Sequence, residues 1–258
     1  ALGRMGRRIL ELAAELENTA IGGAFDMPEF AGREIQAAKL NGEIQTIIIG
    51  DGIASQIINA DVLIDFTSIR SCMDNVRAAA RAGLSAVIGV TGLSENQVDE
   101  LRELSRETAI VYAPNMSLGV NILLDLVRRA AAALDTGYDI EIVEMHHRHK
   151  KDAPSGTALG LAEAAARGRG VSLDRVAVYG REGMVGERPC GEIAVHALRG
   201  GDVVGDHTVI FAADGERIEL AHKASNREAF AKGALTAACW LQGRAPGLYN
   251  MRDVLGLE

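Results

Sequence analysis

Short apolar runs alternate with amphipathic segments along the first half of the chain. Such runs are typical of buried strands, whereas apolar residues at helical spacing predict amphipathic helices. The predicted strands are 20–25, 61–66, 86–90 and 109–112, and the predicted helices are the segment 9–16, a segment ending at about 82, and 94–106. Strands that alternate with helices at this spacing favour parallel βαβ units. Two further apolar runs, 44–49 and 53–58, fit either type of element.

The pattern changes beyond residue 115. The sequence predicts a long helix over 118–134, a strand over 140–145, and a helix that begins at Ser155 and runs to about 167. Strand-like runs follow at 193–198, 203–212 and 217–221, with glycine-rich turns that leave no room for helices between them. These runs predict an antiparallel sheet and therefore a second domain of α+β type. A last helix is predicted over 228–241.

Residues 2–6, Leu-Gly-Arg-Met-Gly, match the back half of a nucleotide-binding turn. Glycines in such a turn let the backbone approach a pyrophosphate, and the N–H groups of the following helix face the negative charge. Asp26 stands twenty residues after Gly6, where an acidic side chain can bind ribose hydroxyls. The alternative is an ordinary glycine turn before a helix. Because a strand normally precedes a nucleotide-binding turn, we expect the intact protein to have one before Ala1.

Two loops follow predicted parallel strands. Residues 89–92 read Gly-Val-Thr-Gly, and residues 113–116 read Ala-Pro-Asn-Met. Ligands of open α/β sheets bind outside the carboxyl ends of the strands, so both loops are candidates for a cofactor crevice. Simple strand-to-helix turn chemistry is the alternative for each loop.

The densest chemistry lies in residues 141–157, EIVEMHHRHKKDAPSGT. Three histidines and two lysines fall between His146 and Lys151, and the carboxylate of Asp152 follows them. Mutual repulsion lowers the pKa values in such a cluster, so an anionic ligand or a proton-transfer role accounts for it best. His146 and Lys150 are four residues apart, which places them on the same side of an extended or helical segment.

An anion site is predicted directly after this cluster. Pro154 fixes the chain, and residues 155–157, Ser-Gly-Thr, begin a helix whose first N–H groups can bind a carboxylate. This arrangement suits a dicarboxylate that undergoes reduction. The alternatives are a zinc site formed by the histidines and a solvated basic strand. Because Arg148, Lys150 and Lys151 lie between and beside the histidines and repel a cation, no metal is expected.

The composition narrows the class of protein. With 258 residues, 48% hydrophobic and only 4% aromatic, the chain can form two modest domains whose cores consist of aliphatic side chains. A net charge of −8 argues against nucleic-acid and anionic-membrane partners. Cys72, Cys190 and Cys239 are far apart, and no apolar run is long enough to span a membrane. We therefore expect a soluble, cytoplasmic protein with reduced thiols.

The run at 141–158, which ends in Ser-Gly-Thr-Ala, closely resembles the signature of bacterial dihydrodipicolinate reductases, now called 4-hydroxy-tetrahydrodipicolinate reductases. The similarity extends over essentially the whole chain through GRMG at 3–6, VLIDFT at 62–67, GVTG at 89–92, APNMS at 113–117, GGDVVGDHT at 200–208, HKASNR at 222–227 and MRDVL at 251–255. The resemblance implies reduction of 4-hydroxy-tetrahydrodipicolinate to tetrahydrodipicolinate by NADH or NADPH, in the diaminopimelate pathway of lysine biosynthesis.

The same resemblance implies a Rossmann-like, parallel-sheet dinucleotide-binding domain formed by 1–117 and 227–258. An α+β domain, 118–226, would bind the small dicarboxylate substrate and form a homotetramer through its sheet. By motif position, His146 is the implied proton donor and Lys150 a second one, and the implied substrate contacts are His147, Gly156 and Thr157. The implied cofactor contacts are Gly3, Arg4, Met5, Asp26, Gly89, Val90, Thr91, Ala113, Pro114, Asn115, Met116 and Arg227.

Met27 bears on the choice of cofactor. It follows Asp26 at a position where some members of the family carry an arginine. A 2′-phosphate beside Asp26 would meet like charge without an adjacent cation, so NADH is predicted over NADPH, although Arg4 could partly compensate. Two other classes stay open: a semialdehyde or amino-acid dehydrogenase with the same two-domain plan, and a non-catalytic dinucleotide sensor. No cysteine lies in a convincing nucleophile setting, and a sensor leaves the basic cluster without a role.

Overall fold

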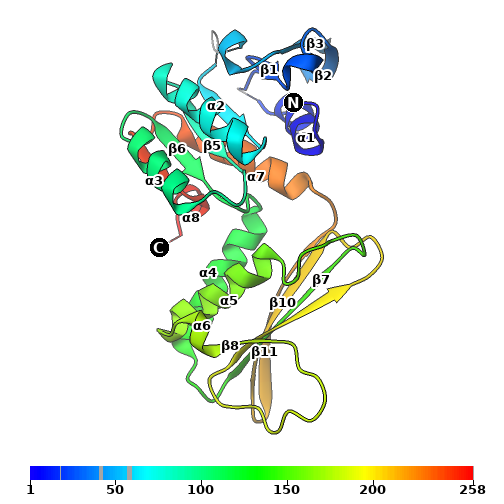
Figure 1. Ribbon diagram of the computed structural model, residues 1–258, viewed down its shortest axis with the longest axis vertical. Coiled ribbons are helices and arrows are strands. Elements are labelled where there is room, and N and C mark those ends of the chain that lie inside the picture. The colour runs from blue at the N-terminus through cyan, green and yellow to red at the C-terminus, as the bar shows by residue number, and fades with distance from the viewer. Residues whose placement is uncertain (18, 41–42, 57–59, 258) are drawn as a thin grey trace. The chain divides into compact units, whose positions relative to one another are not determined.

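The computed structural model describes residues 1–17, 19–40, 43–56 and 60–257 (Figure 1). The chain forms two compact units, one from residues 1–118 and 228–258 and the other from residues 119–227. The chain therefore leaves the first unit and returns to it with its last helices. Among the described residues, no helix combines the length and apolar character needed to cross a lipid bilayer.

The first unit contains a parallel sheet with helices on both faces. In the order β12-β6-β5-β4 its strands are Gly247–Tyr249, Ala109–Tyr112, Ser85–Ile88 and Val62–Asp65. The helices are α2 (Ile69–Arg81), α3 (Glu95–Leu104), α7 (Glu228–Leu241) and α8 (Met251–Leu255). Ile88 and Ile110 pack with α2 and α3, whereas Val87 and Val111 pack with α7 and α8. Burial on both faces explains the continuous apolar runs and confirms the predicted parallel βαβ arrangement.

A second sheet in this unit differs from the sequence prediction. Its strands, in the order β1-β3-β2, are Ala24–Phe25, Glu43–Gly50 and Glu34–Leu40. The strand predicted at 20–25 is thus only two residues long, and 44–49 lies within β3. Strand β2 was not predicted because polar residues interrupt its apolar positions, so that they form no continuous run. In the run 53–58, Ile53–Ser55 forms a 3₁₀ helix and 57–58 lie outside the described residues. Helix α1 (Arg4–Ala13) packs through Ile9 and Leu12 against α7.

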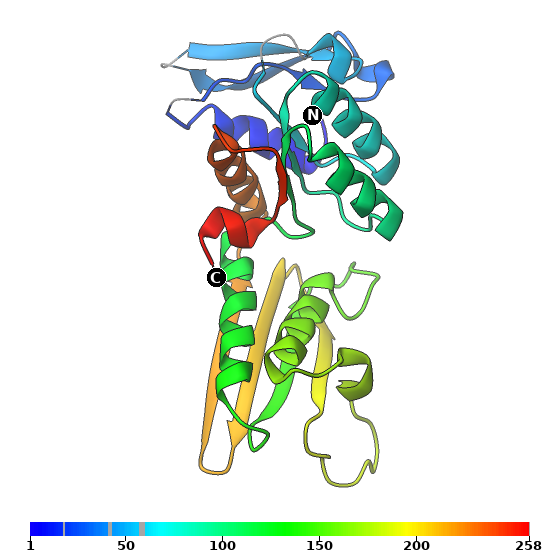
Figure 2. The same ribbon diagram turned by 90° about the vertical axis from the view of Figure 1, so that its left-hand side faces the viewer.

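The second unit has a mixed sheet covered by helices on one face (Figure 2). Its strands, in the order β11-β10-β7-β9-β8, are Glu216–Ala224, Gly205–Ala213, Asp139–His146, Ile193–Arg199 and Ala177–Tyr179. The helices are α4 (Leu118–Ala133), α5 (Gly156–Arg169) and the short α6 (Leu173–Val176). The antiparallel prediction is confirmed for β10 and β11 but is wrong for β9, which pairs parallel with β7 and β8. Strand β10 also pairs antiparallel with β7. Strands β9 and β10 are consecutive but lie on opposite sides of β7, and a hydrophobic pattern contains no information on this lateral order.

The core of the second unit forms from alternate residues of its strands. Ile142 on β7 and Val209 and Phe211 on β10 are fully buried against the alanine-rich faces of α4 and α5. Helix α5 begins after Ser155, whose side chain accepts a hydrogen bond from the backbone N–H of Ala158. A side-chain cap of this kind stabilises a helix by about 1 kcal/mol. The cap therefore fixes the start of α5 at the end of the sheet where the basic motif lies.

Candidate active site

The inward face of the sheet becomes polar at the carboxyl end of β7. Along this strand Ile142, Glu144 and His146 are buried at alternate positions. In the strand register, His207 of β10 lies opposite Glu144, and Arg199 of β9 lies opposite His146. Because alternate residues and cross-strand partners share a face of a sheet, the fold brings these four polar side chains together.

Glu144 is the centre of this polar cluster. Its side chain is 0% exposed, and Arg199 binds it through both terminal nitrogens, at 2.8 Å to Oε2 and 2.9 Å to Oε1. The backbone N–H of Ser155 donates to Oε1 at 3.0 Å, and His146 Nδ1 lies 2.6 Å from Oε2. Burial raises the pKa of the carboxyl, but the hydrogen bonds from Arg199, His146 and Ser155 outweigh it and hold this pKa below its ordinary value. Glu144 is therefore an ionised, buried acceptor.

The contact with Glu144 determines how His146 can act. A carboxylate accepts hydrogen bonds, so Nδ1 of His146 carries a proton and the distal nitrogen Nε2 is left for another partner. A Cβ at Gly205 of β10 would lie 3.0 Å from this Nε2, so a glycine at that position leaves room for the ring. His146 is only 9% exposed. The ring is thus held in one orientation with one nitrogen available to exchange a proton.

His207 is a buried neutral neighbour of His146. The two rings meet edge to face with centroids 5.2 Å apart, and Nε2 of His207 lies 3.1 Å from Oγ of Ser155. Burial, with the charge of His146 as the next cause, lowers the pKa of His207 to about 4, although Glu144 acts in the opposite direction. His207 is therefore uncharged near neutral pH, and it supports the His146 ring without adding a positive charge beside it.

The basic turn after β7 contains the remaining predicted substrate residues. The backbone N–H of Lys150 donates to the carbonyl of His147, and the Lys150 ammonium lies 2.7 Å from Oδ2 of Asp152. The pKa of His147 is lowered, first by burial and then by the charges of His149 and Arg227. Repulsion among these cations, which the sequence predicted as the main cause, is thus second to burial at His147. Arg227, predicted as a cofactor contact, acts electrostatically on a predicted substrate contact.

The N-terminus of α5 lies next to His146. Ser155 donates its backbone N–H to Glu144, and the next two residues, Gly156 and Thr157, form the first turn of the helix. The first N–H groups of a helix have no intrahelical acceptor and favour an anion. The structure therefore brings the predicted anion site and the predicted proton donor together.

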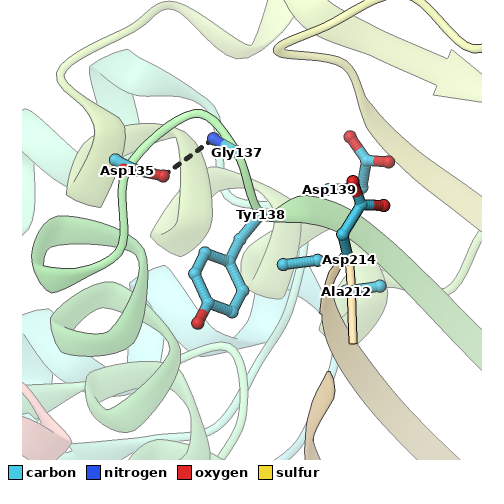
Figure 3. Close-up of a pocket in the computed structure, with 7 residues that line it drawn as sticks. Asp135, Gly137, Tyr138, Asp139, Ala212 and Asp214 are labelled. Atoms are coloured by element: carbon cyan, nitrogen blue, oxygen red, sulfur yellow. Dashed lines mark hydrogen bonds between the residues drawn. The ribbon is translucent and has the colours of Figure 1, made fainter. Parts of the chain in front are cut away.

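A surface depression at the opposite end of β7 has the wrong charge for an anionic substrate. It encloses about 470 Å³ and is lined by Tyr138 and three carboxylates, Asp135, Asp139 and Asp214 (Figure 3). Oδ1 of Asp135 already accepts the backbone N–H of Gly137 at 2.8 Å. Carboxylates clustered in this way repel a dicarboxylate, so the polar end of β7 is the better candidate.

In the first unit, the glycine turn and Asp26 lie together, as the sequence predicted. Oδ2 of Asp26 accepts the backbone N–H of Leu2 at 2.6 Å, and Oδ1 accepts that of Met27 at 2.9 Å. Gly3 precedes α1 without a side-chain cap, and a Cβ at Gly3 would meet no atom within 4 Å. The first turn of α1 contains no acidic residue, so its N–H groups favour a phosphate. These features fit a bound dinucleotide.

The two predicted cofactor loops follow neighbouring parallel strands. Gly89, Val90 and Thr91 come directly after β5, and Ala113, Pro114, Asn115 and Met116 come directly after β6. A Cβ at Gly89 would overlap the ring of Phe66, and one at Gly233 of α7 would overlap the carbonyl oxygen of Met116. Val90 and Met116 are themselves buried, so these positions offer backbone groups rather than side chains to a ligand. The exposed Arg4 and half-buried Met5 belong to the first turn of α1.

Comparison with known proteins identifies the family. Residues 1–116 match the family model "Dihydrodipicolinate reductase, N-terminus", and residues 119–255 match "Dihydrodipicolinate reductase, C-terminus". The chain belongs to the dihydrodipicolinate reductase family. The 4-hydroxy-tetrahydrodipicolinate reductase of Thiobacillus denitrificans is 50% identical over 258 residues, which cover 99% of this chain and 96% of that protein. The enzyme of the same name from Desulfotalea psychrophila is 49% identical over 261 residues, covering 100% and 96%.

Solved structures agree with this assignment. The dipicolinate-bound dihydrodipicolinate reductase from Paenisporosarcina sp. TG-14 aligns with a TM-score of 0.77 at 22% identity, covering 98% of this chain and 95% of the other. Aspartate semialdehyde dehydrogenase II from Vibrio cholerae shares the fold at a TM-score of 0.56 and 13% identity, covering 91% and 94%. The resemblance found in the sequence is therefore confirmed. The protein is a nicotinamide-dependent oxidoreductase that reduces 4-hydroxy-tetrahydrodipicolinate in the diaminopimelate route to lysine.

Sequence reasoning missed three residues at the polar end of β7 in this reductase. Glu144 could have been found, because it precedes His146 by two residues on a predicted strand and so shares its face. His207 and Arg199 become neighbours of His146 only through strand pairing across β7, which local sequence does not indicate. In the described part of the chain, no group of three His, Cys, Asp or Glu side chains is arranged to hold a metal ion.

Proposed function

We propose that His146 is the proton donor in the reduction, and that Lys150 acts beside it as a second donor. The observation that carries this proposal is the contact between His146 Nδ1 and the buried Glu144, which leaves Nε2 available at the start of α5. General acid catalysis by a positioned side chain typically contributes 10²–10⁴-fold to a rate. Lys150 is part of the same turn, and its exposed ion pair with Asp152 can be exchanged for a contact with substrate.

The substrate of this site is a small dicarboxylate. One carboxylate would bind at the first turn of α5, formed by Gly156 and Thr157, with His147 as a further contact. Support comes from the solved family member that is described as dipicolinate-bound, since dipicolinate is also a small ring with two carboxylates. The helix N-terminus and the cations of the turn both favour negative charge.

Loss of the 4-hydroxyl group of the substrate as water gives a conjugated, unsaturated imine ring, and the reduction then adds two hydrogens to this ring. When bound, the reduced nicotinamide supplies one of them as a hydride to a carbon of the unsaturated imine system. The electron pair displaced through the conjugated system is then protonated, and His146 gives up the proton on Nε2. Glu144 remains ionised and holds the other ring nitrogen throughout. His207 and the Ser155 side chain exclude water from the inner side of the imidazole.

The cofactor would be held by the first unit, and NADH is the preferred form. The residues that fit this role are Gly3, Arg4, Met5, Asp26, Gly89, Val90, Thr91, Ala113, Pro114, Asn115 and Met116, with Arg227 from the return segment. Met27 follows Asp26 and is half exposed, so a 2′-phosphate there gains no cation from the adjacent residue. A repulsion of about 1 kcal/mol corresponds to a roughly fivefold lower kcat/KM for NADPH.

The reductase is also proposed to be a cytoplasmic homotetramer. All three cysteines, Cys72, Cys190 and Cys239, are unpaired, which fits a reducing compartment. Exposed apolar side chains of the second unit, Leu198 and Ile218 among them, give its sheet a surface suited to association. Light scattering of the eluted protein measures the oligomer size, and a monomer at micromolar concentration would refute the tetramer.

The replacement His146→Gln tests the proposed function. Kinetics with NADH and freshly prepared substrate should give a kcat at least about 100-fold lower with little change in KM, because the proton donor acts in the transition state. His149→Gln, an exposed neighbour in the same turn, is the matched control and should retain normal turnover. Near-normal kcat for His146→Gln would show that another group delivers the proton.

A further inference from the structure

We propose that Glu144, locked in place by Arg199, is a positioning residue that keeps the proton of His146 on Nδ1 and so presents Nε2 to the substrate. This inference rests on the proposed role of His146 as proton donor. The Glu144 side chain has no exposed surface with which to touch a substrate. It therefore acts through His146.

The geometry around Glu144 leaves the carboxylate little freedom to move. Arg199 binds both carboxylate oxygens and donates in addition to the carbonyls of Leu198 and Asp152. The backbone N–H of Ser155 holds Oε1 from the other side. With these donors directed at it, the carboxylate accepts from Nδ1 of His146 in a fixed direction. The proton on Nδ1 and the ring orientation are then set by the fold before any ligand binds.

The opposite face of β7 provides an internal comparison. There Glu141 pairs with His196 at 2.6 Å, the same distance as in the Glu144–His146 pair, and it also binds arginines, Arg181 and Arg188. However, His196 contacts its glutamate through the distal nitrogen Nε2. That pair uses the nitrogen that could reach a ligand, so it serves to hold the strands and the segment 181–192. Only the pair on the inward face leaves a distal nitrogen for chemistry.

The charged groups around His146 determine whether its imidazolium becomes more or less stable when Glu144 is replaced. Arg199 faces it from β9, and the neutral His207 faces it from β10. His147, whose pKa is lowered, and the Lys150 ammonium belong to the turn that follows it. Among the described residues in contact with the His146 ring, Glu144 supplies the negative charge. Without that charge the imidazolium is surrounded by cations and gives up its proton at lower pH.

The first experiment is NMR of the enzyme without ligands, using ¹⁵N-labelled histidine. Two-bond ¹H–¹⁵N spectra report which nitrogen of each neutral ring carries the proton and at which pH the ring titrates, and His146→Gln assigns the signal. In the wild type the neutral His146 ring should carry its proton on Nδ1. In Glu144→Gln the Nε2–H form should become populated, and the ring should lose its second proton at lower pH than in the wild type. Glu141→Gln, the matched control on the other face, should leave the His146 signal unchanged.

The second experiment is the pH profile of kcat for the same variants. Because the proton donor must be protonated, activity is lost as pH rises, and in Glu144→Gln this alkaline limb should move to lower pH. The maximal kcat should also fall about 10- to 100-fold, as is typical when the group that orients a reactive imidazole is removed. KM should change little, because Glu144 does not touch the substrate. In Glu141→Gln the alkaline limb of the kcat profile should stay at the same pH as in the wild type.

A second variant controls for structural damage, because Glu144→Gln leaves the Arg199 guanidinium without its carboxylate partner. Arg199→Gln removes the cation next to His146 and keeps the Glu144 carboxylate. The midpoint of the His146 titration and the alkaline limb of the kcat profile should therefore both move to higher pH. An unchanged proton position and midpoint in Glu144→Gln, or a shift in the same direction for both variants, would overturn the positioning role. If the NMR behaviour of His146 changes as expected while the kcat profile does not, the assignment of His146 as proton donor fails instead.

Discussion

Acidification should destabilise the second unit through His207. This ring is 4% exposed, and its pKa is lowered to about 4 by burial and by the neighbouring charge of His146. In the unfolded chain the same group titrates near its ordinary value of 6.5. A lowered folded pKa means that the native state favours the neutral ring. The stabilisation is complete above pH 6.5 and is lost as pH falls toward 4, because the unfolded state binds the proton first.

The magnitude follows from the difference between these two pKa values. Each pKa unit corresponds to about 1.4 kcal/mol, so the whole effect approaches about 3.5 kcal/mol below pH 4 and is about 2.5 kcal/mol at pH 4.5. Replacing His207 with Gln removes the titration and keeps an amide that can bind Oγ of Ser155. The variant should therefore lose about 2.5 kcal/mol less than the wild type between pH 7 and pH 4.5.

The measurement must report the unfolding of the second unit alone, because a chain of two units need not unfold in one step. Hydrogen-exchange mass spectrometry of the peptide containing β10, labelled at one fixed pH after equilibration in a urea series, gives its free energy of unfolding at each pH. His149→Gln, which removes an exposed histidine of the basic turn, is the control and should follow the wild type. Equal losses of free energy for the wild type and His207→Gln would refute the reasoning that His207 is held neutral.

Three further outcomes follow from the structure. Gly233→Ala places a Cβ against the carbonyl oxygen of Met116. The variant should therefore destabilise the first unit by about 2 kcal/mol in urea unfolding and raise the KM for NADH. An unchanged midpoint of urea unfolding would contradict this packing. Met27→Arg should raise the NADPH-to-NADH ratio of kcat/KM about fivefold, and an unchanged ratio would show that Asp26 does not meet the 2′-phosphate. Asp152→Asn should lower the KM for substrate up to about fivefold, because the Lys150 ammonium loses an exposed partner, and a higher KM would contradict an exchangeable pair.

Elements with a strong local signal were predictable from the sequence. The runs around Val87 and Ile110 are apolar at every position because both faces of a parallel sheet are buried, and this pattern is distinctive. Helix α7, Glu228–Leu241, was predicted with its observed bounds, whereas the short α8 that follows it was not predicted. Strand β2 was missed because polar residues interrupt its apolar positions, and β9 was placed wrongly because pairing across β7 is a long-range property.

The candidate site shows the same division between local and long-range information. His146, Lys150, Gly156 and Thr157 lie in one continuous motif, so chemical reasoning on the sequence could group them. That reasoning considered Asp152 as the carboxylate beside the cations and gave no role to Glu144. The inward face of β7 provides Glu144, and its ionised state depends on an arginine from β9 that no spacing rule connects to it.

The two carboxylates near the basic turn differ in how easily they can be displaced. Glu144 is fully buried and held by several donors, so removing it from this environment would leave an unpaired charge inside the protein. Asp152 is 64% exposed and binds Lys150 alone among the side chains described, and exposed pairs of this type contribute about 0–1 kcal/mol. A dicarboxylate can therefore take the place of Asp152 at small cost but cannot displace Glu144. In the proposed mechanism, Glu144 keeps His146 oriented, while Asp152 pairs with the Lys150 ammonium until the substrate binds.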